Sequence, residues 1–209
     1  MAIHQTKQDI IDAAVRLFAE KGYDAVTTKE IAADVGITGP AIYNYFKSKA
    51  DILSEIISMF GTKLKTYLLT REQVDKYIQT ETPRQLLQRC IGRFTEEDAP
   101  FMAYAYRIVC REAMTNQKTM DMITRQTAAS TQHVLDSLVE RGMISKMNTE
   151  VFAMAWTQTR FFSAVIWSNK YFNQEAQLSE EALSVYDAVN AWFVDMAVSG
   201  RVQITEPSQ

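Results

Sequence analysis

The segment TTKEIAADVGITGPAIYNYF, residues 27–46, contains two short helical patterns separated by a glycine. Thr27 and Glu30 have the spacing of a capping box, in which a hydroxyl and a carboxylate each accept a hydrogen bond from a backbone N–H at the helix start. Apolar residues then recur along one face, at Ile31, Ala32 and Val35. Gly36 follows, and glycine very commonly ends a helix. We therefore expect a short helix over residues 28–35.

A second short helix is predicted over residues 38–45, with its apolar pattern continuing to Phe46. Thr38 stands at the expected N-cap, and the first turn tolerates Gly39 and Pro40 because its amides have no partner within the helix. Two short helices joined by a tight turn are the anatomy of a helix-turn-helix, whose second helix enters the major groove of DNA. The spacing alone fits an ordinary three-helix bundle equally well.

Longer helices are predicted on both sides of this pair. Thr6 opens the first with a capping-box spacing, and Gly22 ends it. Ser48 opens another over residues 49–68, which would span about 30 Å at about 1.5 Å per residue. The chain has only 7 Gly and 4 Pro, and its apolar residues recur three and four apart almost throughout. We therefore expect an all-α protein.

The net charge of −3 does not by itself favour a nucleic-acid partner, so DNA binding must depend on where the cations lie. Three predicted helix N-termini in this region carry hydroxyl caps, and lysines stand close to them at positions 29, 47 and 49. Free amides at helix N-termini and nearby ammonium groups both suit phosphate oxygens. This arrangement favours the helix-turn-helix over the ordinary bundle.

A spaced pattern runs through residues 7–53 and consists of Ile10, Ala13, Ala14, Leu17, Phe18, Gly22, Thr27, Thr28, Ile31, Ala32, Gly36, Gly39, Ile42, Tyr43, Tyr45, Phe46, Ser48 and Lys49. It closely resembles the DNA-binding domain of the TetR (tetracycline-repressor) family. The resemblance covers about the first quarter of the chain. The remainder is similar to that family only in length and helical character.

The resemblance implies a helix-turn-helix DNA-binding domain over residues 1–48 and a helical ligand-binding and dimerisation domain over residues 49–209. Thr28 and Lys29 match positions at the edge of the groove. The reading face of the recognition helix would consist of Thr38, Gly39, Pro40 and Tyr43, and the positions that meet the DNA backbone are Tyr45 and Lys49. No side chain of residues 39–41 can make a bidentate base contact, so we expect thymine methyls and groove shape to contribute more to specificity.

Residues 151–167 form an apolar stretch whose only charge is Arg160. A membrane span is the alternative, but the stretch is slightly short and polar residues interrupt it, so we expect a helix buried on more than one side. The last predicted helix, Ser179 to Gly200, also has more apolar surface than a monomer needs, with Trp192 among it. The TetR resemblance implies that these last two helices form a homodimer interface, so that two domains bind a two-fold operator in double-stranded DNA.

Methionine and aromatic residues are frequent between residues 60 and 162. Each is explained by an ordinary core, but together they can line an apolar pocket with a few polar anchors. Our candidates for binding a small-molecule effector are Phe94, Met102, Tyr104, Arg107, His133, Trp156 and Arg160. A buried arginine needs an anionic partner, for which Glu112 and Asp136 are the candidates within the chain. If neither pairs with it, an effector with a carboxylate or an aromatic ring is the hypothesis.

The sequence contains no phosphate-binding glycine loop, nucleophile elbow or metal-ligand spacing, so we expect no enzyme, no cofactor and no metal. Cys90 and Cys110 are too few for a disulfide framework and are expected to be reduced and structural, although a redox role stays open. No secretory signal is recognisable, which predicts a cytoplasmic protein.

The TetR resemblance implies a regulator of transcription, expected to be a repressor that a small apolar or aromatic effector releases from DNA. The long helix predicted over residues 49–68 would be the lever between effector and groove. The alternative is a protein-recruiting helical module with a degenerate helix-turn-helix. That alternative predicts loss of the residues that face phosphate, but Thr28, Tyr43 and Lys49 are all present.

Overall fold

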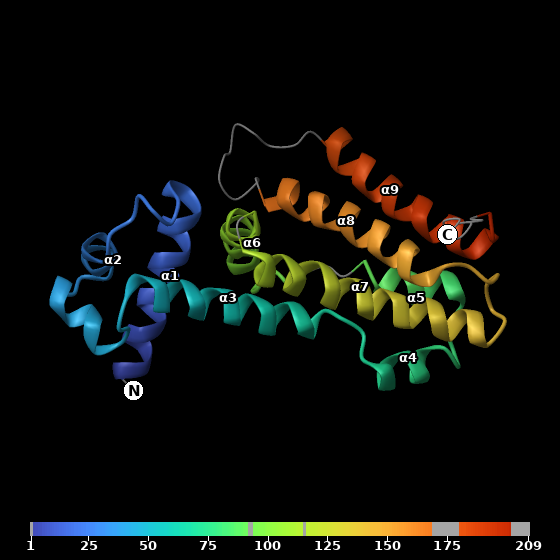
Figure 1. Ribbon diagram of the computed structural model, residues 1–209, viewed down its shortest axis with the longest axis horizontal. Helices are drawn as coiled ribbons and strands as arrows, with labels where there is room; N and C mark the ends of the chain where they lie inside the picture. Colours follow the sequence, from blue (N-terminus) through green and yellow to red (C-terminus); the bar gives the residue numbers. More distant parts are fainter. Residues whose placement is uncertain (1, 92–93, 115, 169–179, 202–209) are drawn as a thin grey trace.

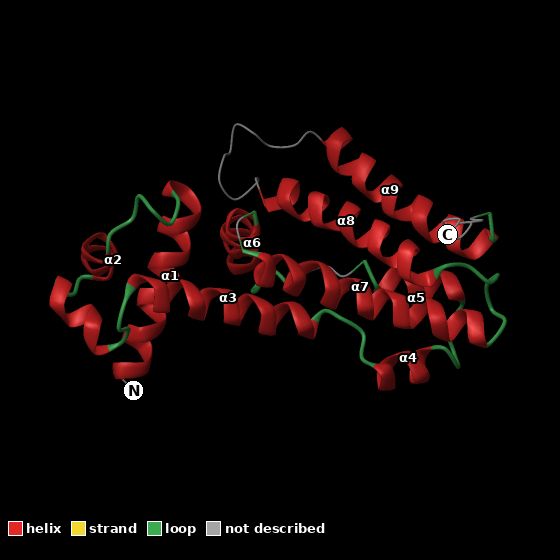
Figure 2. Ribbon diagram, viewed as in Figure 1, coloured by secondary structure: helices red, strands yellow, loops and turns green. Residues whose placement is uncertain are grey.

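The computed structural model describes residues 2–91, 94–114, 116–168 and 180–201 of the 209-residue chain (Figure 1). Its helices are α1 (Ala2–Lys21), α2 (Thr28–Val35), the 3₁₀ helix η1 (Gly39–Asn44), α3 (Lys49–Thr66), α4 (Arg71–Tyr77), α5 (Pro83–Arg89), α6 (Ala99–Ala113), α7 (Gln117–Glu140), α8 (Thr149–Ser168) and α9 (Glu180–Ser199). The described residues contain no strand (Figure 2). The prediction of an all-α protein is confirmed.

Local capping chemistry sets the starts of several helices as the sequence predicts. The Thr27 hydroxyl accepts a hydrogen bond from the Glu30 N–H, and the Glu30 carboxylate accepts one from the Thr27 N–H. Gly36 ends α2 with a φ of 77°, in the left-handed region that a side chain rarely adopts. The Ser48 hydroxyl accepts a hydrogen bond from the Asp51 N–H and starts α3.

Two helix predictions are wrong in detail. The first helix begins at Ala2, so Thr6 lies inside it and does not cap it. The third helix is a six-residue 3₁₀ helix, and the Thr38 hydroxyl makes no capping hydrogen bond. Gly39 and Pro40 explain this difference, because glycine is a poor helix former and proline has no N–H to donate. The Ser179 start of the last helix lies outside the described residues.

Three clusters of buried apolar residues hold the helices together. The first joins α1, α2, η1 and the first half of α3, and it includes Ile108 from α6. The second joins α4, α5, α7, α8 and α9 around Trp156. The third lies between α3 and α6 around Phe60 and Met102. The predicted domain boundary after residue 48 stays a prediction, since the first cluster continues into α3 as far as Ile56.

The helices are arranged so that α3 and α6 connect two ends of the molecule. Figure 1 shows α1, α2 and η1 at one end, and α4, α5 and the long helices α7 to α9 toward the other. α6 is seen almost end-on between α1 and α8, and it packs against both. Over the described part of the chain, no helix is both long enough and apolar enough to cross a membrane.

Candidate functional site: a nucleic-acid interface

The turn between α2 and η1 presents one polar face to solvent. Ile31 and Ala32 anchor α2 in the first core, and Ile42 anchors η1 there, all at or below 1% exposure. Behind Gly36, the Ile37 N–H donates to the Ala32 carbonyl at 2.9 Å and closes the turn. With its apolar side fixed in this way, η1 leaves Thr38, Pro40 and Tyr43 exposed. The four residues predicted on the reading face therefore stand on one exposed or half-exposed segment.

Tyr43 is held in place from the neighbouring helix. Its hydroxyl lies 3.3 Å from the Thr28 hydroxyl at the start of α2, within hydrogen-bond distance. The Tyr43 side chain is nevertheless 56% exposed, which is unusual for a large aromatic residue. Thr28 and Tyr43, predicted separately from the sequence, thus form one unit that spans the two helices. An ordered and exposed tyrosine is suited to contact a DNA backbone or base edge.

Most cations of this region already have partners within the protein. Residues 1–50 contain six Lys or Arg and six Asp or Glu. Three of the cations form ion pairs, Lys7 with Glu55, Arg16 with Asp34 and Lys21 with Glu30. Lys29 and Lys47 are exposed and take part in no ion pair within the described part of the chain. These two lysines are therefore the ammonium groups best able to meet phosphates.

Lys49, predicted to meet the DNA backbone, has a structural role in this fold. Its ammonium group donates to the carbonyls of Tyr23 and Val26, each at 2.9 Å, and lies 4.2 Å from the centroid of the Tyr23 ring. It thereby ties the start of α3 to the loop between α1 and α2. The predicted Tyr45 is half-buried and packs against the first core. The predicted DNA contacts of Lys49 and Tyr45 stay predictions. The exposed Lys47 is better placed for phosphate; the sequence puts it close to a helix N-terminus, but the TetR resemblance does not include it among the DNA-contacting positions.

The seven residues predicted to bind an effector do not lie in one place. Phe94 and Met102 belong to the third core, whereas Trp156 is the fully buried centre of the second. Tyr104 packs against the first core. Arg107 lies near Glu20 of α1, and burial together with the neighbouring Arg111 lowers its pKa. The two residues from α6 that face α1 are thus separated from the other candidates.

Arg160 has an unusual set of partners for a buried cation. Its guanidinium donates to the Cys90 carbonyl and to the hydroxyls of Thr131 and Thr157, all of them neutral. Its Nε is buried without a hydrogen-bond partner among the described residues, and burial lowers the pKa of the side chain. His133 also has a buried ring nitrogen, Nε2, to which no group in the described part of the chain forms a hydrogen bond.

Neither carboxylate that we considered pairs with Arg160. Asp136 accepts a hydrogen bond from the Thr149 hydroxyl at 2.5 Å. Glu112 lies near Tyr23, where it adds to the effect of burial in raising the pKa of that phenol. The buried guanidinium therefore has no carboxylate partner among the described residues.

Both cysteines are free thiols. Burial raises the pKa of Cys90 to about 11 and that of Cys110 to about 12. At pH 8 about 0.1% of a thiol with a pKa near 11 is ionised, compared with about a quarter of an ordinary thiol. Alkylation by iodoacetamide at pH 8 is expected to be at least about 100-fold slower in the folded protein than in urea, measured by mass spectrometry. Equal rates in both states would contradict this.

The raised thiol pKa values also have a consequence for stability. The neutral thiol is favoured in the folded state, so its contribution is fully present below the unfolded pKa of about 8.5. It is lost as pH rises from there through about 11. Denaturation in urea at pH 8 and pH 10 should show lower stability at pH 10, and a Cys90→Ala, Cys110→Ala variant should show a smaller decrease.

Comparison with known proteins gives one consistent family. Residues 10–56 match the model for bacterial regulatory proteins of the tetR family. The chain is 32% identical over 99 residues to the uncharacterized HTH-type transcriptional regulator YerO of Bacillus subtilis, covering 46% of this chain and 32% of YerO. It is 46% identical over 52 residues to the HTH-type transcriptional regulator AcrR of Shigella flexneri, covering 25% and 24% of the two chains. The matches thus span about a third and a quarter of those two relatives.

Solved structures extend the likeness to nearly the whole fold. The TetR-family regulator PfmR of Thermus thermophilus superposes with a TM-score of 0.62 over 93% of this chain and 99% of its own, at 19% identity. FadR of Bacillus subtilis, in complex with stearoyl-CoA, superposes with a TM-score of 0.58 over 92% and 98%, at 21% identity. At these identities the superpositions show a common fold.

The helix-turn-helix unit is therefore similar to the DNA-binding part of regulators of transcription, and the all-helical remainder shares their fold. Residues 10–56 thus match the tetR family, and the rest of the described chain shares the fold of TetR-family regulators.

Proposed function

We propose that the protein is a repressor that binds an inverted-repeat operator as a homodimer and is released by a small effector. The observation that carries DNA binding is the linked pair of the half-buried Thr28 and the exposed Tyr43, together with the exposed cations Lys29 and Lys47, which form no ion pair within the described residues. A degenerate helix-turn-helix in a protein-recruiting module has no need of this arrangement. The geometry therefore supports the regulator over the recruiting module.

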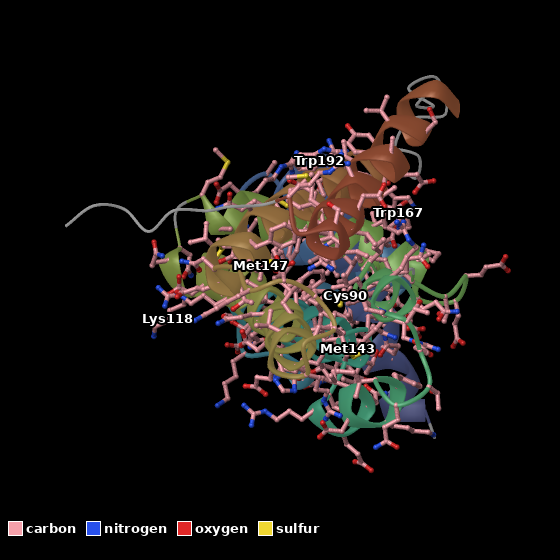
Figure 3. The ribbon with its side chains drawn as sticks, turned by 90° about the vertical axis from the view of Figure 1, so that its right-hand side faces the viewer. Cys90, Lys118, Met143, Met147, Trp167 and Trp192 are labelled. Carbon is pink, nitrogen blue, oxygen red and sulfur yellow. The ribbon has the colours of Figure 1, made fainter. Side chains whose placement is uncertain are left out.

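The proposed dimer interface is the outer face of α8 and α9. The inner face of α9 is fixed, because Trp156 stacks on Phe193 and donates to Asn190 at 3.0 Å. On the outer face, apolar side chains remain exposed at Val185 and Trp192, each 54% exposed, and at Val151 on α8. Figure 3 shows Trp192 on α9 near the upper edge of the molecule, away from the central Cys90. An exposed apolar face of this kind is typical of an association surface.

The proposed coupling between effector and DNA runs through α6 as well as through the predicted lever α3. Met102 and Tyr106 place one side of α6 in the third core, while Ile108 inserts into the first core. Arg111 donates to the carbonyls of Phe18 and Ala19, at 3.3 and 3.5 Å, in the last turns of α1. A displacement of α6 by an effector would therefore move α1, and with it the helix-turn-helix.

The proposed effector is a small apolar or aromatic molecule that lies among the aromatic residues of the second and third cores. An anionic group on it would find a counter-charge in Arg160, whose present partners are all neutral. The complex of FadR with stearoyl-CoA shows that a relative with this fold binds a ligand combining an apolar chain with anionic groups. This complex supports only the proposed chemical class of the effector.

Selection from a random library of duplex DNA tests the repressor proposal. The wild-type protein is expected to enrich an inverted repeat, with half-sites about one helical turn apart or a multiple of it. A Tyr43→Ala, Lys47→Ala variant is expected to enrich no sequence, because it loses the ordered aromatic contact and a phosphate contact. Lys65→Ala, which removes an exposed cation of α3 outside the helix-turn-helix, is the matched control and should select the wild-type site. Enrichment of the same repeat by the double variant would contradict the proposed interface.

A further inference from the structure

An open groove of about 620 Å³ lies between the DNA-binding helices and α6, at the edge of the first core. One wall comes from α1 and α2 and the other from residues 97–104 around the start of α6. Its apolar surface includes Phe101 and Tyr104, which are half-buried. Its volume is within the range of about 300–1,000 Å³ that is usual for small-molecule sites.

The charges around the groove are strongly unequal. Among the described residues that line it, four carry carboxylates, Asp9, Asp12, Asp34 and Glu97, and one, Arg16, is a cation. Arg16 is already neutralised, since its guanidinium lies 2.5 Å from the Asp34 carboxylate. The other charged side chains of the described lining, Asp12 and Glu97 among them, are all negative, so a cationic molecule would gain from entering.

Two of these carboxylates are well placed for a ligand. Asp12 is exposed, and the contact found for it is a neutral one, from the Gln8 amide at 2.8 Å. Glu97 is exposed and takes part in no ion pair within the described residues. They lie on opposite walls, Asp12 on α1 and Glu97 just before α6. A cation between them would be attracted from both sides.

The aromatic wall adds a second attraction for a cation. The face of an aromatic ring is electronegative and attracts ammonium groups, including quaternary ones that cannot form hydrogen bonds. Phe101 already shows this behaviour, because the Lys63 ammonium lies 5.9 Å from its ring centroid. Phe101 and Tyr104 are three residues apart on α6, so their side chains share one side of that helix.

The carboxylates are arranged for a large cation and not for a metal ion. Within the described residues, no group of three or more Asp, Glu, His or Cys side chains is close enough to hold a metal. The groove instead combines separated carboxylates with an apolar and aromatic wall. We propose that this groove binds an organic cation whose charged nitrogen is attached to an apolar or aromatic body.

A ligand in this groove would touch both α1–α2 and α6, the two parts whose packing couples the helix-turn-helix to the rest of the chain. It would thus bind on the outer surface of α6, whereas the effector is proposed to lie inside the second and third cores. The prediction that the cation binds depends on the groove alone. Only an effect of the cation on DNA affinity depends on the proposed function, so cation binding and the proposed function can be disproved separately.

Isothermal titration calorimetry of the full chain with benzyltriethylammonium tests the site, and 3-phenylpropanoate serves as the anionic probe of similar size. The cation is expected to bind with a stoichiometry of one per chain, and the anion is not. An Asp12→Asn, Glu97→Gln variant is expected to weaken binding of the cation at least tenfold. Phe101→Leu, which keeps an apolar side chain without the ring face, should weaken it severalfold.

The control is Glu72→Gln, Glu140→Gln, which removes the same charge from exposed positions on α4 and α7. It should leave the affinity for the cation unchanged. Equal weakening in both double variants would mean that only the net charge matters and would overturn the proposal. Absence of binding to the wild type, or binding that survives loss of Asp12 and Glu97 charge, would also overturn it. Circular dichroism of each variant establishes that it is folded.

Discussion

A Lys29→Ala, Lys47→Ala variant is expected to bind operator DNA about 60-fold more weakly per protomer at 0.1 M salt. Each phosphate contact releases counterions and contributes about 0.9 to the slope of log affinity against log salt, so two lost contacts lower that slope by about 1.8. Both lysines are exposed and outside the ion pairs of this region, so their loss costs the fold little. Fluorescence anisotropy across a salt series measures both quantities.

Lys49→Ala provides the contrast to this variant. The Lys49 ammonium group of the wild type contacts two backbone carbonyls and the ring of Tyr23. Removing it is expected to lower the free energy of unfolding by about 2 kcal/mol. The salt slope of the folded variant should change by less than that of the lysine pair. A slope reduced by about 0.9 in Lys49→Ala, with stability unchanged, would show that Lys49 meets phosphate and that its contacts to carbonyls are dispensable.

A Val185→Glu, Trp192→Glu variant is expected to be a monomer at micromolar concentration, where the wild type is expected to form the proposed dimer. Both side chains are half-exposed in the single chain and would be covered in the proposed interface. Burying two carboxylates without partners costs several kcal/mol, which raises the dimer dissociation constant at least about 1,000-fold. Sedimentation velocity gives the mass, and operator affinity should fall with it because each half-site then binds alone.

Met114→Glu is the matched control for the interface variant. Met114 is 83% exposed at the end of α6, so the same exchange of an apolar for an acidic side chain occurs outside the outer face of α8 and α9. The Met114→Glu variant should sediment like the wild type. A dimer that persists in the Val185 and Trp192 variant would place the interface elsewhere.

The parts of the fold that depend on neighbouring residues were predictable from the sequence. The Thr27 and Glu30 capping box and the left-handed Gly36 are set within a few residues, and both are confirmed. The same signal exists at Thr70 and Gln73, whose capping box starts α4, but we did not use it and missed that helix. At Gly39 the local signals disagree, since a helical apolar pattern begins with two poor helix formers, and a 3₁₀ helix results.

The roles of the long cationic side chains were not predictable in this way. Lys49 reaches carbonyls 23 and 26 residues earlier in the chain, and Arg160 reaches one 70 residues earlier. Spacing along a helix shows which residues share a face, but not which loop the fold brings against that face. Tyr104 and Met102, two positions apart on α6, are expected on nearly opposite sides of that helix, but their spacing does not show that the two sides meet different cores.

The most direct test of the central claim, that the face of η1 meets the DNA, is cleavage of bound DNA from that face. Asn44 is exposed beside Tyr43, and an Asn44→Cys variant can carry an iron chelate, since burial suppresses ionisation of Cys90 and Cys110. We predict cleavage of a selected duplex at two positions related by its dyad. DNA that is bound but uncut by this variant, while a chelate at Glu72→Cys on α4 cuts it, would contradict the claim.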